Sequence, residues 1–170
     1  AALENKIKKI VYASSAAVYG EEPTLPKSEN LPTQVLSPYA QSKKMNEDDA
    51  ELFYRQNHLA TVGLRYFNVF GSRQDPFGAY ASVIPRWIQL LKEKKNIQIY
   101  GQGDQTRDFC HVSQIVQANI RAAISDNALI NGEVFNVGLG RQTSLNQLLQ
   151  MIYSEFGRHS LDINLDLNPV

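Results

Sequence analysis

Residues 7–20 of the chain read IKKIVYASSAAVYG, and they predict a strand that leads to a functional site. Its first part is apolar and rich in β-branched side chains, as in a strand buried in a parallel sheet, and it runs to two serines, Ser14 and Ser15. In an open α/β sheet, ligands bind beyond the carboxyl ends of the strands. We therefore expect a functional site at Ser14 and Ser15.

The segment SPYAQSK, residues 37–43, predicts the start of a helix that carries a reactive pair. Ser37 is a suitable N-cap and Pro38 suits the first helical position. A helix places Tyr39 and Lys43 one turn apart on one face. A phenol is a weak base at neutral pH, and a fixed ammonium beside it favours the phenolate. The pair can therefore form a general base, although an ordinary exposed helix gives the same spacing.

The other segments alternate between strand-like and helical patterns, which is typical of an α/β protein. Short apolar runs predict the strands, and amphipathic runs that follow a capping residue predict the helices. The expected strands cover residues 61–70, 97–100, 133–137 and 161–165; the expected helices cover residues 82–95, residues up to about 125 after the cap Ser113, and residues 145–156 after the cap Ser144.

One loop imitates a dinucleotide-binding motif. Residues 137–143, VGLGRQT, follow a predicted strand and precede a helix, and Asp162 lies about as far on as the ribose-binding acid of such motifs. Thr143 replaces the third glycine, which would allow close packing of helix and strand. We interpret this loop as a turn followed by an N-cap.

Composition excludes several other functions. The chain has 17 Lys and Arg against 17 Asp and Glu and no basic stripe, which gives no support for nucleic-acid binding. No apolar run has the length of a membrane span, so no membrane partner is expected. The single cysteine, Cys110, excludes an internal disulfide and fits a reducing cytoplasm. The three histidines are far apart in sequence, and no metal site is expected.

Five motifs together resemble the extended short-chain dehydrogenase/reductases, and among them the NAD-dependent nucleotide-sugar epimerases and dehydratases. The motifs occur in the family's order: SSAAVYG at 14–20, the Tyr39/Lys43 pair, LRYFNVFG at 64–71, YASVIPRW at 80–87 and IYGQGDQTRDF at 99–109. The resemblance implies the second half of a Rossmann-like, doubly wound parallel sheet over residues 1–78. Residues 79–170 are expected to form part of a small α/β substrate-binding domain, with some elements returning to the sheet.

Members of this family are roughly twice as long as these 170 residues. We therefore expect an internal fragment that lacks the first half of the Rossmann sheet, with its Gly-rich phosphate-binding loop, and the residues after Val170. Strand 7–13 should then have a free edge, and the isolated chain should be inactive and retain no NAD. The resemblance also implies a homodimer formed through the Tyr39 helix, and a cytoplasmic enzyme of polysaccharide biosynthesis.

The resemblance assigns the catalytic roles to Ser15, Tyr39 and Lys43. Tyr39 removes the proton of the sugar 4-hydroxyl while hydride leaves C4 for the nicotinamide of NAD. Lys43 holds the phenolate charge and binds the nicotinamide ribose, and Ser15 hydrogen-bonds the same sugar oxygen. The 4-keto sugar then turns and takes the hydride back on its other face.

Further contacts follow from the same motifs. Cofactor binding is expected from Ser14, Tyr39, Lys43, Tyr66 and Phe67. Binding of the UDP-sugar is expected from Ser15, Asn68, Ser82, Val83, Tyr100 and Arg107, of which Asn68 and Arg107 match positions at the diphosphate and Tyr100 a position at the uracil. Ordinary core packing is the alternative for Tyr66, Phe67 and Tyr100.

The residues after Ser15 bear on the reaction. Dehydratases and decarboxylases of this branch carry acidic residues there, whereas this chain has Ala16 and Ala17, which cannot transfer a proton. This favours a 4-epimerase. Residues 80–87 and 106–110 resemble epimerases of the UDP-N-acetylhexosamine or UDP-glucose type. A glucuronate epimerase, a 4,6-dehydratase or decarboxylase, and a non-catalytic nucleotide-binding remnant remain as alternatives.

Overall fold

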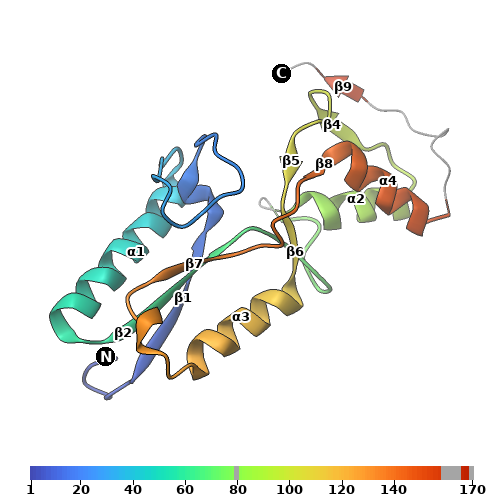
Figure 1. Ribbon diagram of the computed structural model, residues 1–170. Helices are drawn as coiled ribbons and strands as arrows, with labels where there is room; N and C mark the ends of the chain where they lie inside the picture. Colours follow the sequence, from blue (N-terminus) through green and yellow to red (C-terminus); the bar gives the residue numbers. More distant parts are fainter. Residues whose placement is uncertain (79–80, 158–165, 169–170) are drawn as a thin grey trace. The chain divides into compact units, whose positions relative to one another are not determined.

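The computed structural model describes residues 1–78, 81–157 and the backbone of 166–168 (Figure 1). It divides into two compact units that alternate along the chain. Unit 1 contains residues 1–69 and 110–139, and unit 2 contains residues 70–109 and 140–170. The domain boundary expected between residues 78 and 79, with some later elements returning to the sheet, stays a prediction.

Unit 1 is built on a three-stranded parallel sheet. Its order is β1 (Lys9–Ser15), β2 (Ala60–Tyr66) and β7 (Val134–Val137), with β2 in the centre. The register pairs Lys9 with Ala60 and Ser15 with Tyr66. Because the strands are parallel, their carboxyl ends lie at the same end of the sheet. The predicted α/β class with a parallel sheet is confirmed.

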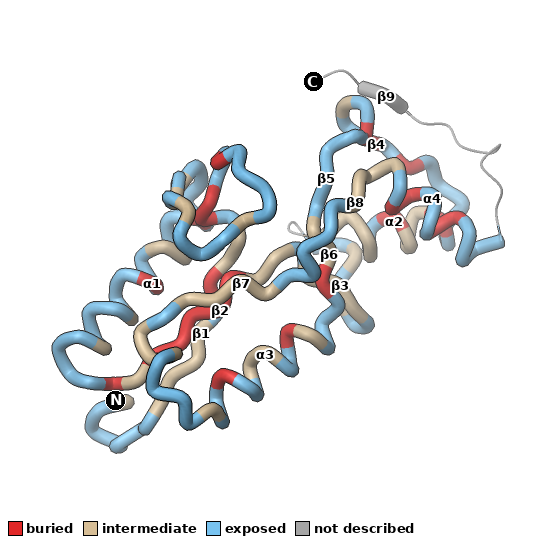
Figure 2. The backbone as a smooth tube through the Cα atoms, viewed as in Figure 1, coloured by how far each residue is buried: buried red, intermediate tan, exposed pale blue. Residues whose placement is uncertain are grey.

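Two helices cover this sheet. Figure 1 shows α1 (Pro38–Asn57) and α3 (Val112–Ile124) on its opposite sides, and both contact β1 and β2. The core around Val62 and Leu64 also contains Ala122 of α3. Figure 2 shows β2 as the buried strand. The side chains of β1 are mostly half-buried, against the prediction of a buried strand, because β1 lies at the edge of the sheet.

Helix α1 begins where the sequence predicts. Ser37 is its N-cap, and the Ser37 hydroxyl accepts a hydrogen bond from the amide of Ala40 at 3.1 Å. Pro38 takes the first helical position, where a missing amide proton costs nothing. The helix extends to Asn57 and ends at His58, whose φ is 55°. Local signals therefore place the Tyr39 helix correctly.

Three boundaries differ from the prediction. The strand predicted from residue 7 begins at Lys9; it ends at Ser15, as predicted, and residues Ala16–Tyr19 form the 3-10 helix η1. The strand predicted over 61–70 is broken at Phe67, after which β3 (Asn68–Phe70) pairs with β6 (Phe109–His111). The cap of α3 is His111 rather than Ser113, because the imidazole of His111 accepts the amide of Ser113 at 3.3 Å.

Unit 2 packs two helices and a short strand around its own core. Helix α2 (Val83–Lys92) and strand β4 (Gln98–Tyr100) match the predicted segments, and α4 (Leu145–Glu155) begins with the predicted cap. Ser144 and Gln147 form a capping box there. The buried core consists of Trp87, Leu91, Ile97, Ile99, Leu148, Leu149, Ile152 and Tyr153.

Short strands complete unit 2. Strand β5 (Thr106–Arg107) pairs antiparallel with β8 (Thr143–Ser144), and β4 pairs parallel with β9 (Asp166–Asn168). The strand predicted over 161–165, with Asp162, lies outside the described residues, as does Tyr80. The remaining element, η2 (Ala128–Ile130), belongs to unit 1.

The described residues also bear on membranes and metals. None of their helices combines the length and apolar character that crossing a bilayer needs. Within the same residues, no three His, Cys, Asp or Glu side chains form a group that could hold a metal ion.

Gly20 closes the turn that follows the Ser15 strand, and its substitution tests that turn. Gly20 has a φ of 57°, and a Cβ there would collide with the backbone carbonyl of Gln34. We expect Gly20→Ala to lower the free energy of unfolding by about 1 to 3 kcal/mol. Gly140 is the matched control, because its φ is 69° but nothing lies within 4 Å of an added Cβ.

Thermal unfolding of both variants measures the difference. Gly140→Ala should cost about 1 kcal/mol, which is the strain of positive φ alone. Equal losses in the two variants would show that the Gln34 carbonyl does not constrain the turn.

Candidate active site

The Tyr39/Lys43 pair forms at the carboxyl end of β1. The Lys43 ammonium lies 5.7 Å from the centroid of the Tyr39 ring. It also donates a hydrogen bond to the carbonyl of Ala13 at 3.3 Å, which attaches α1 to the end of β1. The Tyr39 side chain is 55% exposed. A phenol that solvent and ligands can reach is thus held beside a fixed positive charge.

Ser15 is the last residue of β1 and the N-cap of η1. Its hydroxyl oxygen accepts a hydrogen bond from the amide of Ala17 at 3.2 Å. Accepting this bond fixes the oxygen and leaves the hydroxyl proton available for donation. Ser15 is therefore suited to hydrogen-bond an oxygen of a ligand.

Ser14 points into the protein instead. It is 2% exposed, and its hydroxyl donates to the carboxylate of Glu47 at 2.5 Å. The Ser14 side chain thus already has a buried partner. Its expected part in cofactor binding stays a prediction.

Sequence reasoning missed the ion pair beside Ser14. Glu47 of α1 and Arg65 of β2 are 5% and 6% exposed, and two hydrogen bonds of 2.8 Å join their side chains. Arg65 also donates to the Tyr19 hydroxyl at 2.8 Å. Two signals could have indicated the pair: Glu47 lies one turn after Lys43, and Arg65 interrupts an apolar strand.

Electrostatics keep the Arg65 guanidinium of this pair charged. Burial by itself lowers the pKa of the Arg65 guanidinium, but its hydrogen bonds to Glu47 and Tyr19 outweigh burial and raise that pKa above its ordinary value. Burial, followed by the charge of Glu47, also raises the pKa of the Tyr12 phenol. Tyr12 is therefore a neutral hydroxyl at the pH of the cell.

Tyr66 and Phe67 lie where β2 ends. The Tyr66 hydroxyl accepts a hydrogen bond from the side-chain amide of Asn119 on α3 at 2.8 Å, and its ring packs against the core of unit 1. The amide of Phe67 donates to the carbonyl of Val137 at 3.2 Å. Core packing accounts for Tyr66, and the expected role of both residues at the nicotinamide stays a prediction.

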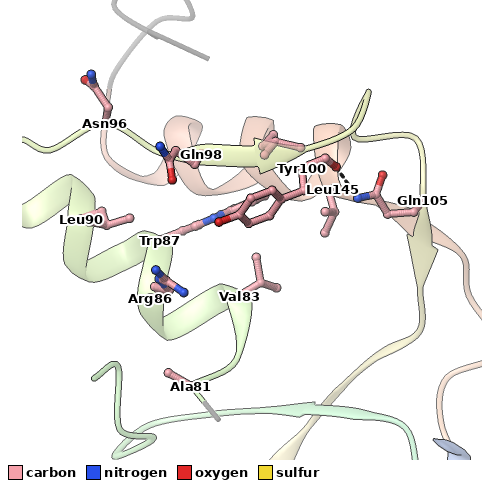
Figure 3. A pocket seen from close by; sticks show the side chains of 11 residues that line it. Ala81, Val83, Arg86, Trp87, Leu90, Asn96, Gln98, Tyr100, Gln105 and Leu145 are labelled. Atoms are coloured by element: carbon pink, nitrogen blue, oxygen red, sulfur yellow. Dashed lines mark hydrogen bonds between the residues drawn. The ribbon is translucent and has the colours of Figure 1, made fainter. Parts of the chain in front are cut away.

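Unit 2 contains a cavity of about 490 Å³ between α2 and β4 (Figure 3). Its buried lining includes Trp87 and Ile99, and the exposed ring of Tyr100 also borders it. Polar groups come from Arg86, Asn96, Gln98 and Gln105, of which Gln105 donates to the carbonyl of Tyr100 at 3.0 Å. Aromatic surface with amide groups around it suits a flat, polar ring.

Several predicted substrate residues lie at or near this cavity. Val83 and Tyr100 line it, and Ser82 is the N-cap of α2 immediately before Val83. Arg107 lies in β5 with an exposed guanidinium that donates to the carbonyl of Thr106 at 2.8 Å. Asn68 lies in β3 and belongs to unit 1. Their roles remain predictions.

Comparison with known proteins places these features in a family. The protein-family model described as "NAD dependent epimerase/dehydratase family" matches residues 1–138 of the sequence. A putative UDP-glucose 4-epimerase of Methanocaldococcus jannaschii is 43% identical over 152 residues, which cover 89% of this chain and 48% of that protein. A UDP-N-acetyl-alpha-D-glucosaminuronate decarboxylase of Bacillus cytotoxicus is 36% identical over 159 residues, covering 90% of this chain and 47% of its own length.

Solved structures give the same picture. The UDP-N-acetylglucosamine 4-epimerase of Methanobrevibacter ruminantium, in complex with UDP-N-acetylmuramic acid, matches with a TM-score of 0.89 and 39% identity, over 99% of this chain and 52% of that one. The UDP-glucuronic acid 4-epimerase of Bacillus cereus, in complex with UDP-glucuronic acid and NAD, matches with a TM-score of 0.81 and 31% identity, over 95% and 48%. The chain spans about half the length of the curated relatives it matches.

Proposed function

The chain belongs to the NAD-dependent epimerase/dehydratase family, and we propose that the whole protein inverts C4 of a UDP-hexose of the UDP-GlcNAc/GalNAc or UDP-Glc/Gal type. The observation that carries this proposal is the exposed Tyr39 phenol beside the Lys43 ammonium at the carboxyl end of β1. The relatives that are named 4-epimerases support it.

The residues at the carboxyl end of β1 fit NAD, the cofactor of the family. The Lys43 ammonium is a donor suited to ribose hydroxyl groups, and the exposed Tyr39 hydroxyl lies beside it. When bound, NAD supplies the acceptor for the hydride that leaves C4 of the sugar. The protein supplies the proton transfer and the orientation.

The proton steps follow from the side chains. Tyr39, as the phenolate, takes the proton of the 4-hydroxyl, and the Lys43 charge stabilises the phenolate. Ser15 donates its proton in a hydrogen bond to the same oxygen, because its own oxygen is fixed by the amide of Ala17. A 4-keto sugar results; once it has turned, C4 would take the hydride back on its other face, and Tyr39 would return the proton to the oxygen. There is no net oxidation or reduction of the substrate.

The nucleotide part of the substrate is assigned to the cavity of unit 2. Uracil is a flat ring with amide-like donors and acceptors at its edge, which the aromatic side chains of Trp87 and Tyr100 and the amides of Gln98 and Gln105 can contact. Arg107 is the proposed partner of the diphosphate, since a guanidinium binds phosphate oxygens in pairs.

Epimerisation is favoured over loss of water or carbon dioxide. Elimination of water needs an acid near the leaving hydroxyl. Ala16 and Ala17 directly follow Ser15 and begin η1, and neither can transfer a proton. The relative from Bacillus cytotoxicus is named a decarboxylase, so a conversion assay has to identify its products.

We also propose that the protein is a cytoplasmic homodimer that contributes to polysaccharide biosynthesis. Three apolar side chains of α1 are exposed: Met45 by 54%, Leu52 by 49% and Phe53 by 47%. A second copy that packs against α1 would bury them. The single cysteine, Cys110, fits a reducing compartment.

Removing the Tyr39 hydroxyl tests the proposed base. In the whole protein, Tyr39→Phe should lower kcat for 4-epimerisation by about 10²- to 10⁴-fold, because no group remains to take the proton. KM for the UDP-hexose should change little. The measurement is conversion of UDP-GlcNAc and UDP-glucose with NAD present, with products identified by chromatography.

Tyr54→Phe is the matched control for this experiment. Tyr54 lies on the same helix, and its ring is so close to Gly132 that a Cβ added there would collide with it. It has no proposed part in the reaction. Its kcat should equal that of the wild type. Unchanged turnover in Tyr39→Phe would contradict the proposal.

Binding of UDP alone tests the cavity of unit 2. Trp87 is the only tryptophan of the chain, so its fluorescence reports on this cavity if no other tryptophan is present in the protein used. Tyr100→Ala should weaken UDP binding about 5- to 10-fold, the equivalent of one lost aromatic contact of about 1 kcal/mol. Phe77→Ala, an exposed aromatic outside this lining, is the control. Equal affinity of wild type and Tyr100→Ala would exclude Tyr100 from the site.

Charge introduced on α1 tests the dimer. Sedimentation of the whole protein should give the mass of two chains, and Phe53→Glu should shift it toward one chain, because a buried unpaired carboxylate is costly. Val116→Glu on α3, 51% exposed in the wild type, should leave the mass unchanged. A wild-type monomer would overturn this proposal.

A further inference from the structure

We propose that Glu47 and Arg65 are positioning residues, whose buried ion pair holds α1 and the end of β1 so that Tyr39 and Ser15 reach the same substrate oxygen. This inference rests on the proposed function, because it assigns the pair a part in that reaction. Neither residue touches the substrate in this proposal. Each acts through the residues it holds.

The first support is the spacing along α1. Tyr39, Lys43 and Glu47 follow one another at intervals of four residues, so they lie on one side of the helix in successive turns. Lys43 donates to the carbonyl of Ala13, and Glu47 accepts from the hydroxyl of Ser14. Two successive turns of α1 are thus bound to the two residues that precede Ser15.

The second support is that both oxygens of Glu47 have strong partners. One accepts from Ser14 at 2.5 Å and from the Nε of Arg65 at 2.8 Å, and the other accepts from an Nη of Arg65 at 2.8 Å. Such paired bonds fix direction as well as distance. The position of α1 relative to β1 and β2 is therefore set by a planar, two-bond contact.

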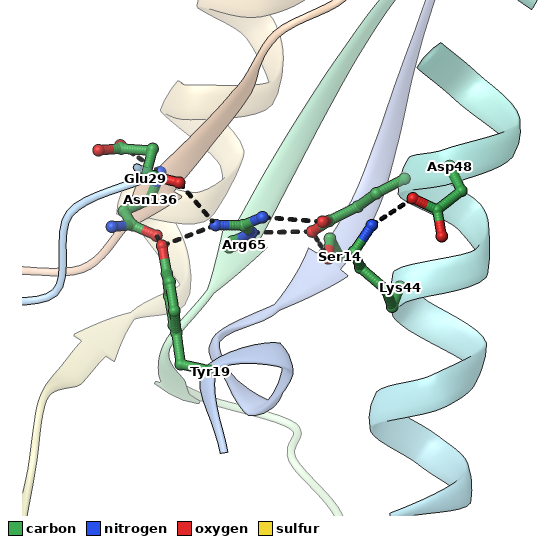
Figure 4. Close-up of polar contacts among 8 residues, drawn as sticks. Ser14, Tyr19, Glu29, Lys44, Asp48, Arg65 and Asn136 are labelled. Atoms are coloured by element: carbon green, nitrogen blue, oxygen red, sulfur yellow. Dashed lines mark hydrogen bonds and ion pairs between the residues drawn. The ribbon is translucent and has the colours of Figure 1, made fainter. Parts of the chain in front are cut away.

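The same guanidinium also holds the chain after Ser15. Its remaining Nη donates to the hydroxyl of Tyr19 in η1, and that hydroxyl donates to the side-chain carbonyl of Asn136 on β7 (Figure 4). The Arg65 guanidinium carbon also lies 4.8 Å from the centroid of the Tyr19 ring. Ser15 is thus bracketed in sequence by two residues that the network holds, Ser14 before it and Tyr19 after it.

Stability alone does not explain this arrangement. A buried ion pair recovers little more than the cost of removing its charges from water, and apolar side chains of similar size often serve stability as well or better. A bidentate pair fixes geometry in a way that apolar contacts do not. A misplacement of about 1 Å at a reacting centre can cost about 10² in rate.

Single and double variants of the whole protein separate positioning from folding. Glu47→Gln and Arg65→Met each leave a buried partner without its counter-charge, and each should lower the thermal midpoint. Each should also lower kcat about 10²-fold, with KM for the UDP-hexose within about twofold. The double variant contains no unpaired buried charge, so its thermal midpoint should return toward the wild-type value. Its kcat should remain low.

A smaller change covers the case in which a single variant does not fold. Ser14→Ala removes the hydroxyl that joins Glu47 to β1 and leaves the ion pair intact. It should lower kcat several-fold with KM unchanged. The matched control is Glu51→Gln on the same helix, since Glu51 is 49% exposed and pairs with Arg55 at the surface. Its kcat and thermal midpoint should both equal those of the wild type.

The outcomes are distinct. A double variant whose kcat recovers together with its thermal midpoint would show that the pair serves folding only, and would overturn the inference while the proposed function stands. Wild-type kcat in Ser14→Ala and in either single variant would overturn it too. A wild type that converts no UDP-hexose with NAD overturns the proposed function, and this inference with it.

Discussion

The parallel pairing of β1 with β2 is the constraint on which the rest of unit 1 depends. Its register, from Lys9 opposite Ala60 to Ser15 opposite Tyr66, brings the carboxyl ends of both strands to the same end of the sheet. A slip by one residue would turn every side chain of β1 to the other face of the sheet. Ser14 would then lose Glu47. The chemistry proposed for Ser15 and Tyr39 therefore begins with backbone hydrogen bonds rather than with the reactive side chains.

What the sequence could predict is local. Ser37 and Pro38 indicate the start of α1, because a capping side chain and the fixed φ of proline act within one helical turn. Ser144 indicates the start of α4 as a capping residue. The run that ends at Ser15 is recognisable as a strand from its apolar pattern alone. Sequence reasoning also identified Tyr39 and Lys43 as neighbours, since helical spacing determines that they are.

What it could not predict depends on contacts between distant segments. The ion pair of Glu47 with Arg65 joins a helix to a strand; local signals single out each residue, but they do not show that the two are partners. His111 caps α3 because its position in β6 brings the imidazole to the amide of Ser113. The prediction of Ser113 as the cap, which rested on residue type alone, is therefore wrong. The half-buried state of β1 follows from its place at the edge of the sheet; the family resemblance predicts that free edge, whereas the apolar composition of the strand does not.

One face of α1 combines two demands that usually conflict. A general base must be open to its substrate, and the frame that aims it must be rigid. Along this face Tyr39 is exposed, Lys43 is half-buried and Glu47 is buried. Because a helix is stiff over two turns, the fixed position of Glu47 is transmitted to Tyr39 while the phenol itself stays accessible. A buried charge pair eight residues from the base is thus a suitable anchor: far enough to leave the site open, and close enough to determine where it points.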